Sequence, residues 1–156
     1  MILAAFPPSL VLAVVFVIGT LLGSLANWAI YRLAWNPREI SPWGPTPTGV
    51  QPRSALDRVP VVGWLGVARE SSLHGRGFWI RPLLIELFMG MGFAALCWWE
   101  VYERMLIVPQ LEEILRLNQI GATVDPAQVP LTAVWATFLA HTVLITLIVA
   151  ASFIDI

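Results

Sequence analysis

Three long apolar stretches, almost free of charge, decide which solvent this chain folds in. Residues 1–31 hold no charged side chain, residues 82–99 hold only Glu86, and residues 129–154 hold none. A helix needs roughly 20 apolar residues to cross about 30 Å of hydrocarbon. With 58% hydrophobic and 12% charged residues, the composition excludes an ordinary soluble domain. We predict an all-α membrane protein: a polytopic helical bundle with three transmembrane helices and a Pro-rich cytoplasmic loop.

The arginines predict how these helices are oriented. The segment 34–81 has six Arg against three acids, whereas residues 100–128 have five acids against two Arg. Cytoplasmic loops carry the excess of positive charge, so the first loop should be cytoplasmic and the N-terminus outside. The expected segments are transmembrane helix 1 (1–33), the cytoplasmic loop (34–81), transmembrane helix 2 (82–101), the outer loop (102–128) and transmembrane helix 3 (129–156).

The cytoplasmic loop should be irregular in its first half. Six prolines lie between Pro37 and Pro60, and each disfavours helix in the residue before it. The single cysteine, Cys97, lies in the second apolar stretch, which excludes an intrachain disulfide and a cysteine zinc cluster. We interpret Cys97 as a buried structural thiol.

Several polar or small residues in the apolar stretches need an explanation. An ionisable group at the edge of a span is a functional candidate by default, so Asp155 is either a site residue or an interfacial acid without a role. His141 would donate a hydrogen bond to a neighbouring helix or shuttle a proton. Gly19 and Gly23 have the small-xxx-small spacing that lets two helices approach closely.

Four sequence elements, in order, resemble one family. They are residues 19–33 (GTLLGSLANWAIYRL), residues 57–65 (DRVPVVGWL), residues 75–87 with "GR" and "RPLLIEL", and the pair Ile154-Asp155. They resemble the N-terminal region of the prepilin leader peptidases (type IV prepilin peptidases, aspartic peptidase family A24). The family shows "D-N-I-P-x-x-S-W-L" and "G-R … R-Y-P-x-x-E-L" at the corresponding places, and then an Ile-Asp that begins its first catalytic motif.

The resemblance implies which residues form the site. It assigns Asp155 as a catalytic carboxylate, and it implies substrate-binding or structural roles for Gly23, Ser24, Asn27, Arg32, Asp57, Pro60, Trp64, Arg81, Pro82 and Glu86. Simpler interpretations stay open for two of the acids: Glu86 would form an ion pair with Arg81 or Arg32, and Asp57 would cap a turn.

The chain departs from the family in its loop cysteines. Family members commonly hold two Cys-x-x-Cys pairs there, thought to bind zinc, whereas this loop has no cysteine and offers only His74 as an imidazole. We therefore expect no zinc and no metal ligand. The aromatic side chains of Trp43, Trp64, Phe78 and Trp79 would replace the metal by packing together.

The second departure concerns catalysis. Aspartic proteolysis needs two carboxylates, one as base and one protonated, and the family's second one, in Gly-x-Gly-Asp, would lie beyond Ile156. We expect that the sequence is the N-terminal part of a longer enzyme; the alternatives are that the missing helices come from another chain or that catalysis is lost.

The resemblance implies an endopeptidase of the bacterial inner (plasma) membrane that cleaves leader peptides of type IV pilin-like precursors at the cytoplasmic face. The alternative is a non-catalytic three-helix membrane protein that binds such precursors or pilus and secretion assembly partners. Proteolysis needs no cofactor, and many members also N-methylate the new terminus with S-adenosylmethionine. The expected partners are pilin-like precursors, the lipid bilayer and the remaining C-terminal helices of the enzyme, and no nucleic acid.

Overall fold

The computed structural model describes residues 6–33, 40–103, 112–113 and 130–154, and these are helical or irregular, with no strand. Three helices are long and apolar enough to cross a membrane: α1 (Pro8–Leu33), α4 (Ile80–Cys97) with its continuation η4 (Trp98–Tyr102), and α6 (Leu131–Ile154). The prediction of an all-α protein with three membrane-length helices is confirmed.

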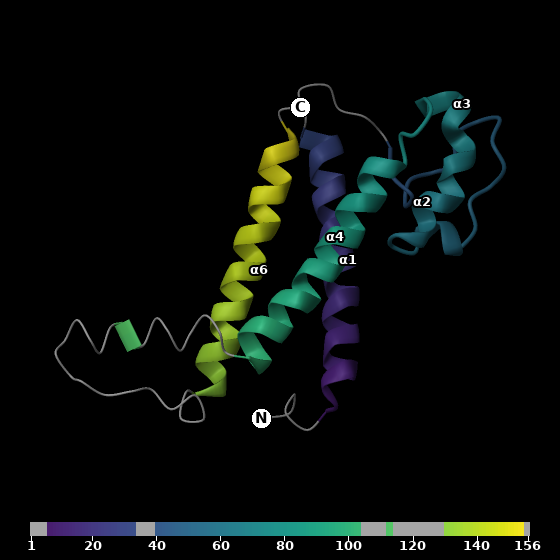
Figure 1. Cartoon of the computed structure of the whole chain (residues 1–156). Helices are drawn as coiled ribbons and strands as arrows, with labels where there is room; N and C mark the ends of the chain where they lie inside the picture. Colours follow the sequence, from purple (N-terminus) through teal and green to yellow (C-terminus); the bar gives the residue numbers. More distant parts are fainter. Residues whose placement is uncertain (1–5, 34–39, 104–111, 114–129, 155–156) are drawn as a thin grey trace.

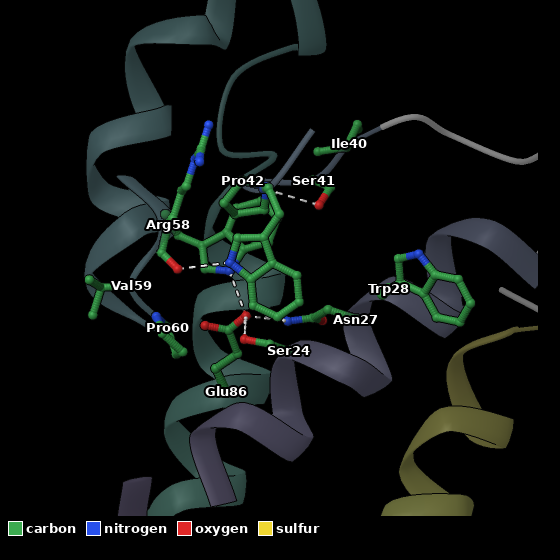
Figure 2. Close-up of a pocket in the computed structure, with 12 residues that line it drawn as sticks. Ser24, Asn27, Trp28, Ile40, Ser41, Pro42, Arg58, Val59, Pro60 and Glu86 are labelled. Atoms are coloured by element: carbon green, nitrogen blue, oxygen red, sulfur yellow. Dashed lines mark hydrogen bonds between the residues drawn. The ribbon is translucent and has the colours of Figure 1, made fainter. Parts of the chain in front are cut away.

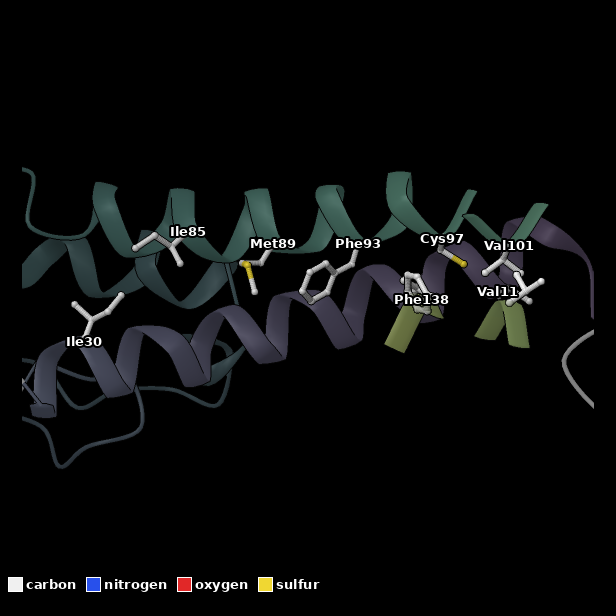
Figure 3. Close-up of a cluster of buried hydrophobic side chains, with 10 residues drawn as sticks. Val11, Ile30, Ile85, Met89, Phe93, Cys97, Val101 and Phe138 are labelled. Carbon is white, nitrogen blue, oxygen red and sulfur yellow. The ribbon is translucent and has the colours of Figure 1, made fainter. Parts of the chain in front are cut away.

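The three helices form an up-down-up bundle (Figure 1). α1 and α4 pack along most of their length, whereas α6 meets α4 mainly near η4 and diverges from it toward the other end. Side chains buried between them include Ile30, Met89, Phe93 and Phe138 (Figure 3). Only 11% of the most apolar window of α6 is buried, against 39% for each of the other two spans.

Glycines allow the close contact between α1 and α4. A Cβ atom on Gly19 would lie 2.8 Å from Cα of Gly90, and one on Gly23 would lie 2.7 Å from Cα of Glu86. Both separations are too short for real atoms, so larger residues would force the helices apart. The predicted role of these two glycines in helix packing is confirmed.

A small unit made from the segment between α1 and α4 lies beyond one end of the bundle, the same end at which α6 finishes (Figure 1). Residues 40–55 form turns and extended chain without a helix, as the prolines predict. Short helices follow: η2 (Leu56–Arg58), α2 (Val62–Val67), η3 (Ala68–Glu70) and α3 (Ser71–His74). We call residues 40–79 the loop unit.

α4 begins at Ile80 and carries Pro82 in its first turn. Proline fits there because the first N–H groups of a helix have no partner within it. At its far end the helix widens into the π-turn η4, where the N–H of Glu103 bonds to the carbonyl of Trp98. The helix therefore begins two residues before the predicted start of the second span and ends one residue after its predicted end.

Candidate functional site

The carboxylate of Glu86 is the centre at which α1, α4 and the loop unit meet. Its side chain is 2% exposed. Oε1 accepts hydrogen bonds from Ser24 Oγ at 2.6 Å, Trp64 Nε1 at 2.9 Å and Asn27 Nδ2 at 3.3 Å. Oε2 accepts one from the backbone N–H of Val61 at 2.6 Å. A carboxylate can accept about four such bonds, so the acceptor capacity of Glu86 is filled.

The expected ion pair between Glu86 and Arg81 is wrong. The guanidinium of Arg81 lies 4.7 Å from the ring centroid of Phe153, and its Nη2 donates to the carbonyl of that residue at 3.4 Å. The other suggested partner, Arg32, is exposed at the end of α1. Glu86 is surrounded by neutral donors because the face of α4 that carries it lies against α1 and the loop unit, whereas Arg81, five residues earlier, lies against Phe153.

Asn27 ties α1 to α4 at a second point. Its Nδ2 also donates to the carbonyl oxygen of Pro82 at 2.9 Å. The sequence-predicted positions Gly23, Ser24, Asn27, Pro82 and Glu86 are therefore all in one contact region. Because Asn27 is 3% exposed, its loss would leave two buried acceptors short of a donor.

Val61 has a strained backbone at this centre. Its φ of 66° and ψ of −62° are rare for any residue and costly for a β-branched one. The N–H of Val62 closes the turn on the carbonyl of Pro60 at 2.7 Å. Such strain persists only where surrounding contacts impose it, and the bond from Val61 to Glu86 is one of them. Pro60 thus takes part in a γ-turn that sits on the Glu86 carboxylate.

A narrow cavity lies above Glu86 between α1 and the loop unit (Figure 2). It has about 20 Å³ of room for a water-sized sphere, and its lining includes Ser24, Asn27, Trp43, Pro60 and Trp64. That volume is enough for about one water molecule. A larger groove of about 610 Å³ lies beside Trp28, Tyr31, Arg32, Thr46 and His74.

Two ion pairs, one of them buried, hold the loop unit together. Arg53 binds Glu70 through two bonds, Nε to Oε1 at 2.8 Å and Nη2 to Oε2 at 2.7 Å, and its Nη1 donates to the carbonyl of Ser41 at 2.6 Å. The side chains of Arg53 and Glu70 are 4% and 0% exposed. The hydrogen bonds from Arg53 lower the pKa of Glu70 although burial opposes the shift.

The second pair joins Asp57 to Arg69. Nη1 and Nη2 of Arg69 donate to Oδ1 and Oδ2 of Asp57 at 3.1 and 2.7 Å, and the backbone N–H of Ser54 donates to Oδ2 at 2.6 Å. The bonds from Arg69, with that from Ser54, hold the pKa of Asp57 well below its usual range. The predicted turn cap is confirmed through Ser54, but the ion pair is an addition that sequence reasoning missed.

The conjectured aromatic cluster is not what holds the loop unit. Trp64 is buried, but Trp43 is about half exposed and donates its indole N–H to the carbonyl of Arg58. Phe78 contacts the ring of His74 at a centroid distance of 5.0 Å. In the described part of the chain, no three His, Cys, Asp or Glu side chains come together as metal ligands.

Sequence reasoning missed Arg53, Arg69 and Glu70. Their partners lie 12 and 17 residues away along an irregular segment, so no helical or strand periodicity links them. The sequence shows that arginines and acids occur in the same loop, but which of them pair depends on how the loop folds in three dimensions.

Asp155 lies outside the described residues. The last described turn of α6 ends at Ile154, and Arg81 contacts this turn at Phe153.

Residues 17–100, more than half of the chain, match the family model described as the bacterial peptidase A24 N-terminal domain. The matched segment spans most of α1, the loop unit and α4. No curated protein and no solved structure was found to match the chain.

Proposed function

Since the chain belongs to the family of bacterial A24 peptidase N-terminal domains, we propose that it is part of a membrane aspartic endopeptidase that removes leader peptides from type IV pilin-like precursors. In this proposal Asp155 supplies one carboxylate of the catalytic pair, and the remaining C-terminal helices supply the other. Cleavage takes place at the cytoplasmic face of the bacterial inner membrane, where the arginine-rich loop unit is placed by the charge bias of the sequence.

The contact between Arg81 and Phe153 carries this proposal. It links the first turn of α4, which follows the loop unit directly, to the last described turn of α6. The last described turn of α6 lies at the same end of the bundle as the loop unit, and Phe153 precedes Asp155 by two residues in the sequence. A guanidinium at the C-terminal end of a helix also stabilises the negative end of its dipole.

The chemistry requires a second acid that the described residues do not supply. Close carboxylates share one proton, so that one acts as base while the other donates to the carbonyl oxygen. Glu86 is a poor substitute because its two oxygens already accept four hydrogen bonds inside the protein. If no further helix joins the bundle, the lack of a second available acid among the described residues favours the alternative, a non-catalytic protein that binds pilin-like precursors.

The groove beside Trp28 does not fit S-adenosylmethionine. Among the described residues that line it, Arg32 contributes a positive charge and none contributes a carboxylate. The methyl donor carries a sulfonium cation and ribose hydroxyls, and in dinucleotide-binding folds an acidic residue holds the ribose.

The test of the proposal is Asp155→Asn in the complete enzyme, assayed for cleavage of a pilin-like precursor in membranes. The amide can neither accept the proton of water nor share the proton of the pair, so cleavage should be abolished while membrane insertion is unchanged. Glu112→Gln, an exposed acid outside the site, is the matched control and should cleave normally. Full cleavage by Asp155→Asn would mean that the wrong acid has been assigned; precursor binding without cleavage by the wild type would support the alternative.

The orientation is tested separately. A cysteine at Thr48 should react only with reagents added from the cytoplasmic side, and a cysteine at Gln119 only with reagents added from outside. The reverse pattern would move the loop unit, and with it Asp155, to the other face.

A further inference from the structure

An ionisable pair lies in the half of the bundle away from the loop unit. The side chain of its acid, Glu100 in the π-turn η4, is 2% exposed, and that of its base, His141 on α6, is 36% exposed. Oε1 of Glu100 lies 2.5 Å from Nδ1 of His141. Neither residue contacts the Glu86 centre or the end of α6. An acid and a base kept inside a membrane bundle are costly to bury, and are by default functional.

The pair depends on one proton. A short contact between an imidazole nitrogen and a carboxylate oxygen requires a proton between them, whichever group carries it. With that proton the pair has no net charge. Oε2 of Glu100 is buried and has no hydrogen-bond partner among the described residues. Among the described side chains, only His141 therefore forms a hydrogen bond with the carboxyl group of Glu100.

Among the described residues, Glu100 and His141 form an ion pair with each other and with no other charged side chain. The other titratable residues at this end of the second span are Cys97 at the end of α4, Tyr102 on η4 and Glu103, which follows η4 and is exposed. Of the buried residues of α1 and α6 near the pair, Val11 and Phe138 are apolar (Figure 3), and Thr142 is uncharged and donates its hydroxyl to the carbonyl of Phe138. A second proton would therefore leave a positive imidazolium beside a neutral acid, with the attraction between them lost and no anion in place to replace it.

The pair sits where α6 is attached to the bundle. The residues of α6 buried in the structure, Val134, Phe138 and Thr142, all lie in its first half and flank His141. Beyond them α6 diverges from α4 and leaves an apolar cleft of about 720 Å³ between Phe88 and Val149. α6 also packs against α1, and near its end Arg81 of α4 contacts Phe153. The Glu100–His141 pair is therefore the polar contact that joins α6 to the far end of the second span, on the other side of the cleft from Arg81.

The π-turn contributes to this attachment. It adds one residue to a turn of α4 at the level where the helix meets α6. Single π-turns are frequent at functional sites, and this one carries the only charged residue between Cys97 and Tyr102.

We propose that Glu100 and His141 form a proton-dependent clasp that fixes the tilt of α6 against α4, and that uptake of a second proton releases it. Both are positioning residues: they act on the end of α6, and they bear on catalysis only through the proposed role of Asp155. The clasp itself is a property of the bundle and is measurable without any cleavage assay.

The experiment measures the distance between spin labels across the cleft in the full chain. Cysteines replace Phe88 and Val149, with Cys97→Ala as the common background. Between about pH 8 and about pH 4, the wild-type pair of labels should change from a narrow to a broad distance distribution. The double variant Glu100→Gln/His141→Gln keeps a neutral hydrogen bond and should stay narrow at both pH values.

Two further arms keep the test decisive. Glu100→Ala removes the clasp and should give a broad distribution at both pH values, even if the double variant fails to insert. Labels at Leu25 and Leu84, on α1 and α4, should show no change with pH. The clasp would be contradicted by an unchanged distribution in the wild type, by a narrow distribution in Glu100→Ala, or by equal broadening between α1 and α4. If Asp155→Asn failed to abolish cleavage, the proposed function would be contradicted but the clasp would not.

Discussion

Trp64 and Glu86 are joined by a hydrogen bond of 2.9 Å from the indole Nε1 to the carboxylate Oε1. An aromatic ring of the loop unit is thereby tied to an acid inside the second membrane helix. Because both side chains are 2% exposed, neither can exchange this contact for water. The position of the loop unit on the bundle depends on this bond and on the bond from Val61.

Trp64→Phe should loosen the loop unit without emptying its core. The phenyl ring keeps most of the packing but cannot donate to Glu86, and a hydrogen bond to a charged group contributes about 1.5–3 kcal/mol. We expect a loss of that order in the unfolding free energy of the loop unit, measured by hydrogen exchange of residues 56–74. Trp43→Phe, at a half-exposed ring, should change it by less. Equal effects would show that the bond to Glu86 is unimportant.

Arg53→Ala should destabilise the loop unit strongly. It leaves the carboxylate of Glu70, which is 0% exposed, without its partner, and breaking a buried pair from one side costs about 3–5 kcal/mol. Proteolysis of the loop unit in membranes would report the loss. Arg76→Ala, at an exposed arginine of the same unit, should leave the digestion rate unchanged; a similar rate for both variants would contradict the structural role of the pair.

The stability of the loop unit should fall in acid. The folded-state pKa values of Asp57 and Glu70 are both lowered, so their stabilisation is fully present above the unfolded pKa of about 4 and is lost as the pH falls below it toward the folded values. Hydrogen exchange between about pH 7 and about pH 3, corrected for intrinsic rates, would measure this. Asp57→Asn should be less stable at neutral pH and show a shallower decline. An equally steep decline would mean that other groups cause it.

Zinc chelators should leave the loop unit unchanged. The loop unit is cross-linked by the ion pairs Arg53–Glu70 and Asp57–Arg69. A structural zinc site needs about four thiolate or imidazole ligands, and the loop unit has no cysteine and one histidine, His74. Elemental analysis of the purified protein should find no stoichiometric zinc, and chelators should not alter the protease resistance of residues 40–79. One tightly bound zinc per chain would refute this.

The helices could be predicted from the sequence because they obey local rules. Runs without charge predicted the three spans, and the spacing of Gly19 and Gly23 predicted the close contact with α4. The family motifs also selected Ser24, Asn27, Trp64 and Glu86 as site residues, and the structure brings these four together.

The partners of those residues could not be predicted. Arg81 precedes Glu86 by five residues, which suggests an ion pair, yet it contacts Phe153, 72 residues away. The pairing of Arg53 with Glu70 and of Glu100 with His141 likewise depends on how distant segments meet. The γ-turn at Val61 has no sequence signature, since a β-branched residue is the least expected one there.

The weak attachment of α6 has a consequence for the order in which the protein is made. Synthesis proceeds from the N-terminus, so α1, the loop unit and α4 are made before α6. Every hydrogen bond described at Glu86 comes from residues 24–64, and this centre can therefore assemble while the third helix is still being translated. The third helix then packs onto two helices that are already joined at Glu86.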